Sequence, residues 1–202
     1  MDLYTFGTPN GHKISIMLEE LKVPYNVKKI DITKGDQNSP EFLKINPNGK
    51  IPALVDGETT VFETIAIMIY LADKYGMFLA NSGPKRYETL QWCMFQAAGL
   101  APNLGQFGHF TVFAKEKVPY AIERFSAEVN RLFGVLEAQL AKGPFLVGED
   151  YSIADMATWP WIEGYATFYK QKIDGAKFPN LKRWYHEIAK RPAVQRGIKI
   201  PN

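Results

Sequence analysis

Strand-forming segments in this chain are confined to its first 76 residues, and this confinement limits the folds open to it. The short apolar segment DLYTF is followed by apolar residues spaced three and four apart from Ile14 to Leu21, the pattern of a helix with one buried face. The segment YNVKKIDI then alternates like a second strand, and IPALVDGETTVF is typical of a hairpin that turns at Asp56-Gly57. The chain therefore begins with a strand, a helix, a strand and a hairpin.

A predicted helix from Glu63 to Tyr75 closes this first unit, and Gly76 is a favourable residue just after its end. One further helical turn is expected at Ser39-Pro40, between the second strand and the hairpin. The resulting order, βαβαββα, is that of the thioredoxin fold. It combines a parallel βαβ unit with an antiparallel hairpin and a closing helix.

Beyond a linker-like segment, GMFLANSGP, only helical patterns occur. The clearest spans residues 119–141, where apolar residues repeat at spacings of three and four. The segment SIADM is close to a capping box at the start of another helix, with Ser152 three residues before Asp155. We therefore predict an α/β thioredoxin-like N-terminal domain over residues 1–76, a linker over 77–84 and an all-α C-terminal domain over 85–202.

The cysteine and histidine counts restrict the chemistry of the chain. Its single cysteine, Cys93, cannot form an internal disulfide and lies in an apolar helical run, LQWCMFQ, where we expect inert core. The three histidines are scattered, so we expect no metal. A single cysteine also suits a reducing compartment, and we expect a cytoplasmic protein.

Hydropathy and charge argue against other classes of protein. No run of about 18 apolar residues occurs, and the start, MDLYTF, lacks the features of a signal peptide, so no membrane association is expected. The net charge is +3, with a basic excess from Lys170 onward. A basic segment can bind nucleic acid, but Trp184 and Tyr185 fall at core spacing within it, which favours a solvated basic surface. A nucleic-acid partner is therefore not expected.

The junction between the first strand and the first helix reads FGTPNGHK and contains no sulfur. In thiol-redox proteins this junction carries a cysteine, because a helix N-terminus stabilises a thiolate. Here it offers Thr8, Pro9 and Asn10, and we expect Asn10 to be the helix N-cap with Gly11 in the first turn. A reactive sulfur has to come from elsewhere.

Three motifs, in order along the chain, resemble those of the cytosolic glutathione transferases. NGKIPALVDG resembles the family's loop with a cis X-Pro peptide, FETIAIMIYLADKYG its Glu-Ser/Thr helix start, and SIADM the capping motif of its second domain. The segments TPNGHKI, GDQNSPEFLKINPN, GLAPNLGQFGHF and PYAIERF resemble the Nu-class bacterial enzymes, which are disulfide-bond oxidoreductases. They equally resemble the glutathione-binding domain of the fungal prion-forming nitrogen regulator. The resemblance implies that glutathione brings the sulfur, and that the protein is a homodimer.

The resemblance also implies which residues bind each part of glutathione. A cis bond between Ile51 and Pro52 would turn the Ile51 backbone outward, where it could pair with the cysteinyl backbone of the ligand. Glu63 and Thr64 begin a helix whose N–H groups suit the γ-glutamyl carboxylate, and the Glu63 carboxylate would meet the ligand's ammonium group. A helix cap with an acidic first turn is the structural alternative for this pair, and both roles can hold together.

The resemblance implies three more candidate ligands. Gln37 or Lys50 would meet the glycyl end of glutathione, and Arg124, in AIERF, would bind a glutathione carboxylate from the second domain. For Gln37 the alternative is a polar loop residue. For Arg124 it is an exposed surface arginine, because this position lies off the apolar stripe of its helix.

Thr8 and Asn10 are the expected catalytic residues, donating to the glutathione sulfur together with free N–H groups near Gly11. Lowering a thiol pKa from about 8.5 by about two units requires roughly 2.7 kcal/mol. A helix dipole contributes about 0.3–1 kcal/mol and each good donor to an anion about 1.5–3 kcal/mol, so no general base is needed. The alternative for Asn10 is a helix cap alone.

Other side chains near these segments have open roles. Tyr4 could activate the sulfur or face the core, and His12 is expected at the solvent-facing side of its helix. His109 and Phe110 could line a pocket or simply pack.

The favoured function is a glutathione-dependent disulfide-bond oxidoreductase with a small disulfide as its partner. Both sulfurs then come from ligands, which suits a site with donors but no cysteine. Conjugation of glutathione to a small electrophile is the enzymatic alternative. A non-catalytic glutathione-binding regulatory module is the third, although the sequence carries no Asn/Gln-rich head like that of the fungal regulator.

Overall fold

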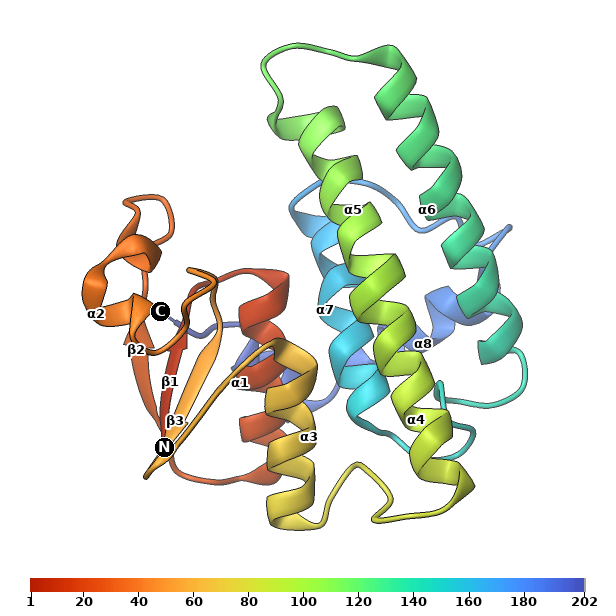
Figure 1. Cartoon of the computed structure of the whole chain (residues 1–202). Coiled ribbons are helices and arrows are strands. Elements are labelled where there is room, and N and C mark those ends of the chain that lie inside the picture. The colour runs from red at the N-terminus through yellow and green to blue at the C-terminus, as the bar shows by residue number, and fades with distance from the viewer. Residues whose placement is uncertain (202) are drawn as a thin grey trace. The chain divides into compact units, whose positions relative to one another are not determined.

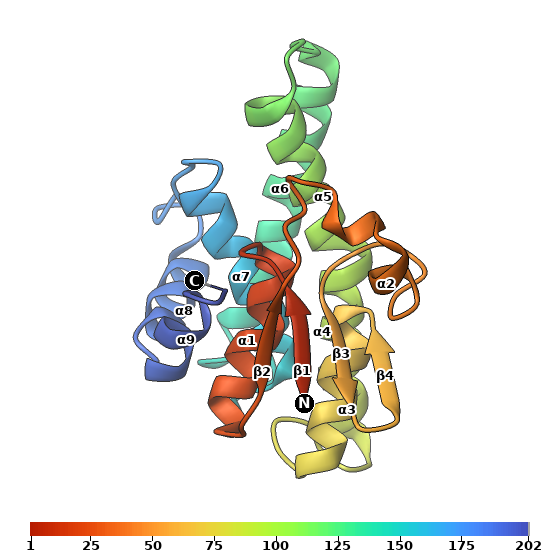
Figure 2. The same cartoon turned by 90° about the vertical axis from the view of Figure 1, so that its left-hand side faces the viewer.

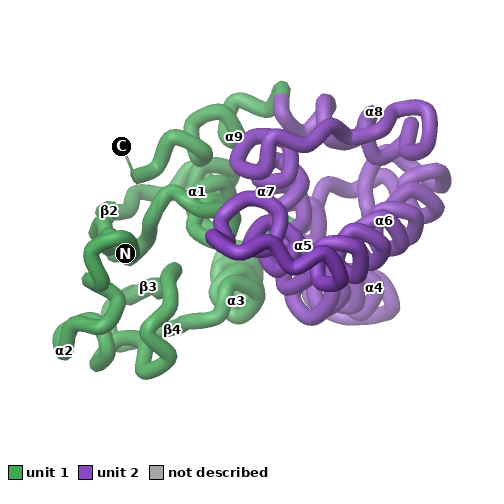
Figure 3. Tube along the Cα trace, turned by 90° about the horizontal axis from the view of Figure 1, so that it is seen from above, with its two compact units in different colours: residues 1–79, 190–202 green, residues 80–189 purple. Residues whose placement is uncertain are grey.

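The computed structural model describes residues 1–201 and divides into two compact units (Figures 1 and 3). The first unit comprises Met1–Leu79 together with the C-terminal segment from Lys190, and the second is Ala80–Ala189. The segment from Lys190 groups with the first unit because helix α9 (Pro192–Gly197) packs on helix α1 (Pro9–Leu21). The domain boundaries predicted from the sequence, 1–76, 77–84 and 85–202, stay a prediction.

A four-stranded sheet organises the first unit, and its strand order is β2-β1-β3-β4 (Figure 2). The strands are β1 (Asp2–Thr5), β2 (Asn26–Lys29), β3 (Ala53–Asp56) and β4 (Thr59–Phe62). Strand β1 pairs parallel with β2 and antiparallel with β3, and β3 pairs antiparallel with β4. This topology confirms the predicted thioredoxin-like fold.

Helices α1 and α3 (Thr64–Tyr75) pack side by side behind the sheet in Figure 2. Their apolar faces supply the core of this unit together with the central strands. Its fully buried side chains include Leu3, Ile14, Leu18, Leu54, Ile67 and Leu71. The loop after β2 holds a 3-10 turn, Asp36–Asn38, and helix α2 (Pro40–Leu43), whose N-cap Ser39 accepts a hydrogen bond from the Phe42 amide.

The second unit is built from helices, as predicted. They are α4 (Pro84–Met94), α5 (Ala101–Gly108), α6 (Pro119–Leu140), α7 (Ile153–Thr167) and α8 (Pro179–Ala189), with π-helical segments at Phe95–Leu100 and His109–Phe113. Cys93 is buried in α4, as expected. Within residues 1–201 we find no helix with the length and apolarity needed to cross a bilayer.

Asp155 anchors the start of α7 from a buried position. Its Oδ2 accepts from the Ser152 amide and hydroxyl, each at 3.1 Å, and its Oδ1 accepts from the Leu146 amide at 3.0 Å and the Trp184 indole at 2.9 Å. Burial raises the pKa of the Asp155 carboxyl, and these donors oppose the rise. The predicted capping box is thus confirmed, and it also ties α7 to α8 and to the loop before α7.

We expect Asp155→Ala to lower the free energy of unfolding by about 3 kcal/mol or more, because several buried donors lose their acceptor. Urea unfolding measures this loss. The matched control is Asp150→Ala in the same loop, where the carboxylate pairs with Lys85 at the surface and its loss should cost about 0–1 kcal/mol. Equal losses in the two variants would contradict this account of the capping box.

Candidate functional site

The turn between β1 and α1 brings the helix directly against the end of the strand. A Cβ added at Gly11 would lie 2.1 Å from the Phe6 carbonyl oxygen and 2.5 Å from Thr5 Oγ1. No side chain fits at those distances, so only glycine lets the first turn of α1 approach β1 so closely. The close approach fixes where the polar residues of this turn lie.

Thr8, not Asn10, is the N-cap of α1, so the expected cap was wrong. Thr8 Oγ1 accepts from the Gly11 amide at 3.2 Å, and the Thr8 carbonyl accepts from the His12 amide at 2.9 Å. The Gly11 and His12 amides are therefore occupied, and neither is among the free N–H groups expected near Gly11. Since a hydroxyl has one donor and two acceptor sites, Thr8 can still donate its hydrogen. Half-buried Asn10 lies in the first turn beside it.

The start of α3 has the features of an anion site. Its N-cap, Glu63, has φ 68°, which for a residue other than glycine costs of order 1–3 kcal/mol and is typical of functional sites. The first N–H groups of any helix lack partners within it. Thr64, the first residue of α3, is half-buried, and its Oγ1 accepts from Lys13 Nζ at 3.1 Å. A carboxylate would find backbone donors, a hydroxyl and a nearby ammonium here.

The Ile51-Pro52 peptide bond is cis, as predicted. Ile51 lies just before β3, and among the backbone hydrogen bonds described for residues 1–201 outside helices and strands none involves its N–H or C=O. Buried Asn46 shapes this loop, because its Nδ2 donates to the Lys50 carbonyl at 2.6 Å and its Oδ1 accepts from the Asn48 amide at 3.0 Å. The Lys50 side chain is exposed.

Gln37 lies in the 3-10 turn after β2, and its Oε1 is buried without a hydrogen-bond partner. Buried acceptors are nearly always paired in folded proteins, so such an atom is a candidate ligand-binding group. This observation favours a binding role over that of a plain loop residue.

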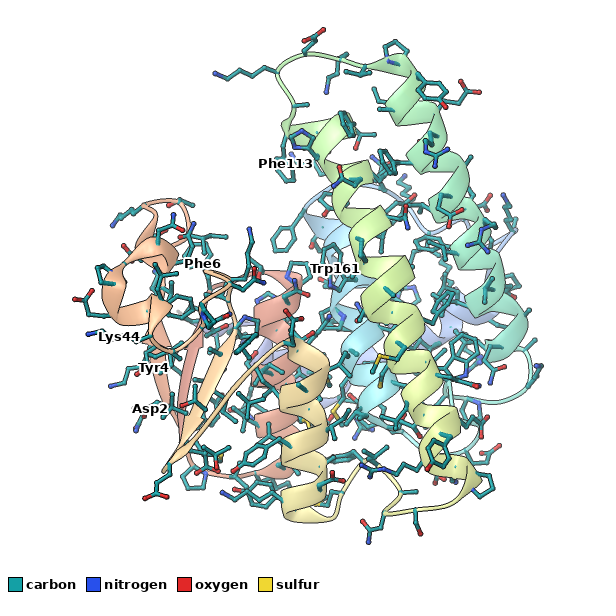
Figure 4. All side chains as sticks on the ribbon, viewed as in Figure 1. Asp2, Tyr4, Phe6, Lys44, Phe113 and Trp161 are labelled. Carbon is teal, nitrogen blue, oxygen red and sulfur yellow. The ribbon has the colours of Figure 1, made fainter. Side chains whose placement is uncertain are left out.

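His12 and Tyr4 are both set by packing. His12 is 8% exposed, so its expected solvent-facing position was wrong, and burial lowers the pKa of its imidazole to about 4. The Tyr4 ring packs with Phe42, with ring centroids 6.2 Å apart (Figure 4 labels Tyr4 on β1). Because its pKa is about 4, the buried His12 imidazole is neutral at physiological pH.

The second unit contains a cavity of about 730 Å³ that Arg124 helps to line. Arg124 is exposed, and the charged residues beside it include Glu128, which accepts a two-pronged hydrogen bond from Arg131 at 2.8 and 2.7 Å. Phe110 stacks on Phe125 with centroids 5.7 Å apart. Arg124 thus lies in a polar cavity of its own unit, and Phe110 has a packing role.

Comparison with known proteins identifies the family. The N-terminal domain of glutathione S-transferases matches residues 1–73, and the C-terminal domain matches residues 100–192. The disulfide-bond oxidoreductase YfcG of Escherichia coli K12 is 47% identical over 205 residues, which cover 98% of this chain and 94% of YfcG. The chain belongs to the glutathione S-transferase family. Within it, this transferase falls in the YfcG branch, as the sequence motifs predicted.

Solved structures of relatives contain glutathione. A transferase family member from Pseudomonas fluorescens pf-5, with two glutathione bound, is 44% identical with a TM-score of 0.94, and the match covers 99% of this chain and 92% of that one. A transferase from Pseudomonas putida, with one glutathione disulfide bound per subunit, is 39% identical with a TM-score of 0.95, covering 100% and 91%.

Sequence reasoning missed two residues that shape the candidate site. Lys13 joins the second turn of α1 to Thr64. The sequence signal for this residue was a charged side chain on the same apolar helix face as Met17. Asn46 orders the loop before Ile51, and no local pattern marked it as buried.

Within residues 1–201 we find no group of three or more His, Cys, Asp or Glu arranged to hold a metal ion.

The buried His12 predicts a fall in stability at mildly acidic pH. Its pKa is about 4 in the folded state and about 6.5 unfolded, so the unfolded chain binds the proton between these values. Stability present above pH 6.5 is therefore lost as pH falls, by about 2 kcal/mol between pH 7.5 and pH 5. Urea unfolding should show that His12→Gln loses this component. His109→Gln, at an exposed histidine, is the control, and an unchanged pH dependence in His12→Gln would refute the assignment.

Proposed function

We propose that this transferase is a glutathione-dependent disulfide-bond oxidoreductase in which the ligand supplies the sulfur. The observation that carries the proposal is the Thr8 cap at the start of α1, which presents a hydroxyl beside Asn10 where thiol-redox proteins place a cysteine. Two further facts support it: the similarity to YfcG over nearly the whole chain, and the glutathione bound in related structures.

The proposed binding mode divides glutathione among the segments of the first unit. The γ-glutamyl carboxylate would lie at the start of α3, accepting from backbone amides and from the Thr64 hydroxyl, with the Glu63 carboxylate near the ligand's ammonium group. The cysteinyl backbone would pair with Ile51, next to Pro52. The glycyl end of glutathione would reach Gln37 or Lys50. The buried Gln37 Oε1, which has no hydrogen-bond partner, supports Gln37.

Arg124 is proposed as a ligand for a glutathione carboxylate. It lines a cavity large enough for part of a peptide-sized molecule, and a planar guanidinium can bind a carboxylate through two parallel hydrogen bonds. Its exposure means that the ligand would not have to break an existing buried ion pair.

Thr8 and Asn10 are proposed to stabilise the glutathione thiolate. With the Gly11 amide occupied, two side chains and the helix dipole remain, each side chain worth about 1.5–3 kcal/mol and the dipole about 0.3–1 kcal/mol. Their sum still meets the roughly 2.7 kcal/mol needed to lower a thiol pKa by about two units. Neutral His12 would take no part in the proton transfer.

The proposed reaction moves two electrons from two glutathione molecules to one disulfide. The first glutathione thiolate attacks a sulfur of the small disulfide, forming a mixed disulfide and releasing one thiolate, which takes up a proton. A second glutathione thiolate attacks the glutathione sulfur of the mixed disulfide. Glutathione disulfide forms and the second substrate thiol leaves.

Three broader features also belong to the proposal: the Nu class, a homodimer and a cytoplasmic location. The motif resemblance supports the first two, and reliance on glutathione with one buried cysteine supports the third. Sedimentation at micromolar concentration tests the dimer, and a monomer there would contradict it. Cell fractionation tests the location.

A side-by-side assay tests the proposed reaction against its alternatives. Glutathione-coupled reduction of a small disulfide should be much faster than conjugation of glutathione to a halogenated aromatic. The reverse ranking would make conjugation the function, and binding of glutathione without either activity would indicate a regulatory module.

Asn10→Ala should slow disulfide reduction by roughly 10- to 150-fold and raise the pKa of the thiol of bound glutathione. The reason is the loss of one hydrogen-bond donor to the thiolate, worth about 1.5–3 kcal/mol. Stopped-flow rates and thiolate absorbance across pH measure both effects. Thr8→Ala should act in the same direction while Thr8→Ser retains most of the rate, and Cys93→Ala is the control with the wild-type rate. Unchanged turnover per folded molecule in Asn10→Ala would reduce Asn10 to a structural role.

A further inference from the structure

Lys13 is a buried charged residue on α1. Only 1% of its surface is exposed, and it lies on α1 between buried residues such as Ile14 and Met17. Lysine is almost never fully buried unless its ammonium group has partners, because removing the charge from water is costly.

The Lys13 ammonium group connects α1 to the start of α3. Its Nζ donates to Thr64 Oγ1 at 3.1 Å, which links the second turn of α1 to the first residue of α3. Because the Thr64 oxygen accepts this bond, its own hydrogen is directed away from Lys13. The hydroxyl is thus oriented to donate to another acceptor.

The same contact brings a positive charge to the start of α3. A carboxylate accepting from the Thr64 hydroxyl would lie within about 6 Å of the Lys13 ammonium, a range in which opposite charges attract strongly in a partly buried site. The amide dipoles at the start of α3 act on the carboxylate in the same direction. Three features on two helices therefore favour a negative charge at one place.

We propose that Lys13 is a positioning residue for carboxylate recognition: it orients the Thr64 hydroxyl and adds a fixed positive charge at the start of α3. The proposal rests on the proposed function, in which this point receives the γ-glutamyl carboxylate. Lys13 acts on the ligand through Thr64 and through its charge, without touching the sulfur. It therefore contributes to ligand binding in the ground state and the transition state alike.

The test pairs Lys13→Met with a ligand that lacks the carboxylate. Calorimetry at fixed salt compares glutathione with an analogue in which 4-aminobutyryl replaces the γ-glutamyl group. We expect Lys13→Met to bind glutathione about 10- to 100-fold more weakly than the wild type, and to bind the analogue with an affinity within about threefold of the wild type. Equal weakening of both ligands, or of neither, would overturn the proposal.

Kinetics separate this role from general destabilisation. Because Lys13 is proposed to stabilise the ground state and the transition state equally, Lys13→Met should raise KM for glutathione by about the same factor as it weakens binding. The kcat should stay within about threefold of the wild-type value. Ser15→Ala is the control for a weakened α1, because it removes the buried hydrogen bond from Ser15 Oγ to the Gly197 carbonyl, which is 2.7 Å long. Lys28→Met, at an exposed lysine, controls for the lost charge. Neither control should raise KM.

Thr64→Val tests the same proposal if Lys13→Met does not fold. It removes the oriented hydroxyl, so glutathione should bind about 5- to 20-fold more weakly, with no change for the analogue. Unchanged glutathione affinity in Thr64→Val would overturn the proposal. A wild-type protein that binds no glutathione would instead refute the proposed function itself, so the two failures are distinguishable.

Discussion

The contact between the first turn of α1 and the end of β1 is the constraint on which the rest of the site depends. A Cβ at position 11 would lie 2.1 Å from the Phe6 carbonyl oxygen, so only glycine fits there, and α1 begins at Pro9 with Thr8 as its N-cap. The opposite side of α1 is held as closely, because a Cβ at Gly197 would lie 2.7 Å from Ile16 Cα. Two ion pairs strengthen that contact: Arg191, the N-cap of α9, pairs with Glu20 at 2.6 Å, and Arg196 in α9 pairs with Glu19 at 2.6 Å.

Two neighbouring buried residues of α1, His12 and Lys13, differ in charge and in role. His12 and Lys13 are both buried. Desolvation lowers the pKa of His12, which leaves a neutral ring at physiological pH. Lys13 instead donates to Thr64, at a point where a helix start already favours negative charge. One helix thus presents neutral donors at its start and an ammonium group toward the start of α3.

A site without its own nucleophile suits an exchange in which both sulfurs arrive on ligands. The only cysteine of the sequence, Cys93, is buried in the helical second unit. Neutral donors such as Thr8 and Asn10 can stabilise a thiolate without forming a covalent bond to it. Such donors leave the glutathione sulfur free to attack and to be attacked, as the proposed two-step exchange requires.

The sequence alone determined the order of the strands and helices, the hairpin at Asp56-Gly57, the capping box at Ser152 and the family. Each depends on signals within a few residues of each other, such as helical periodicity, turn residues and short motifs. Only the tertiary structure decided that Thr8 rather than Asn10 caps α1, that His12 and Lys13 are buried, and that α9 packs on α1. The cap depends on the three-dimensional approach of Gly11 to Phe6 and Thr5, which the propensity of single residues does not encode. The other outcomes depend on close contacts between residues distant in the chain, as at Lys13 and Thr64 or at Gly197 and Ile16.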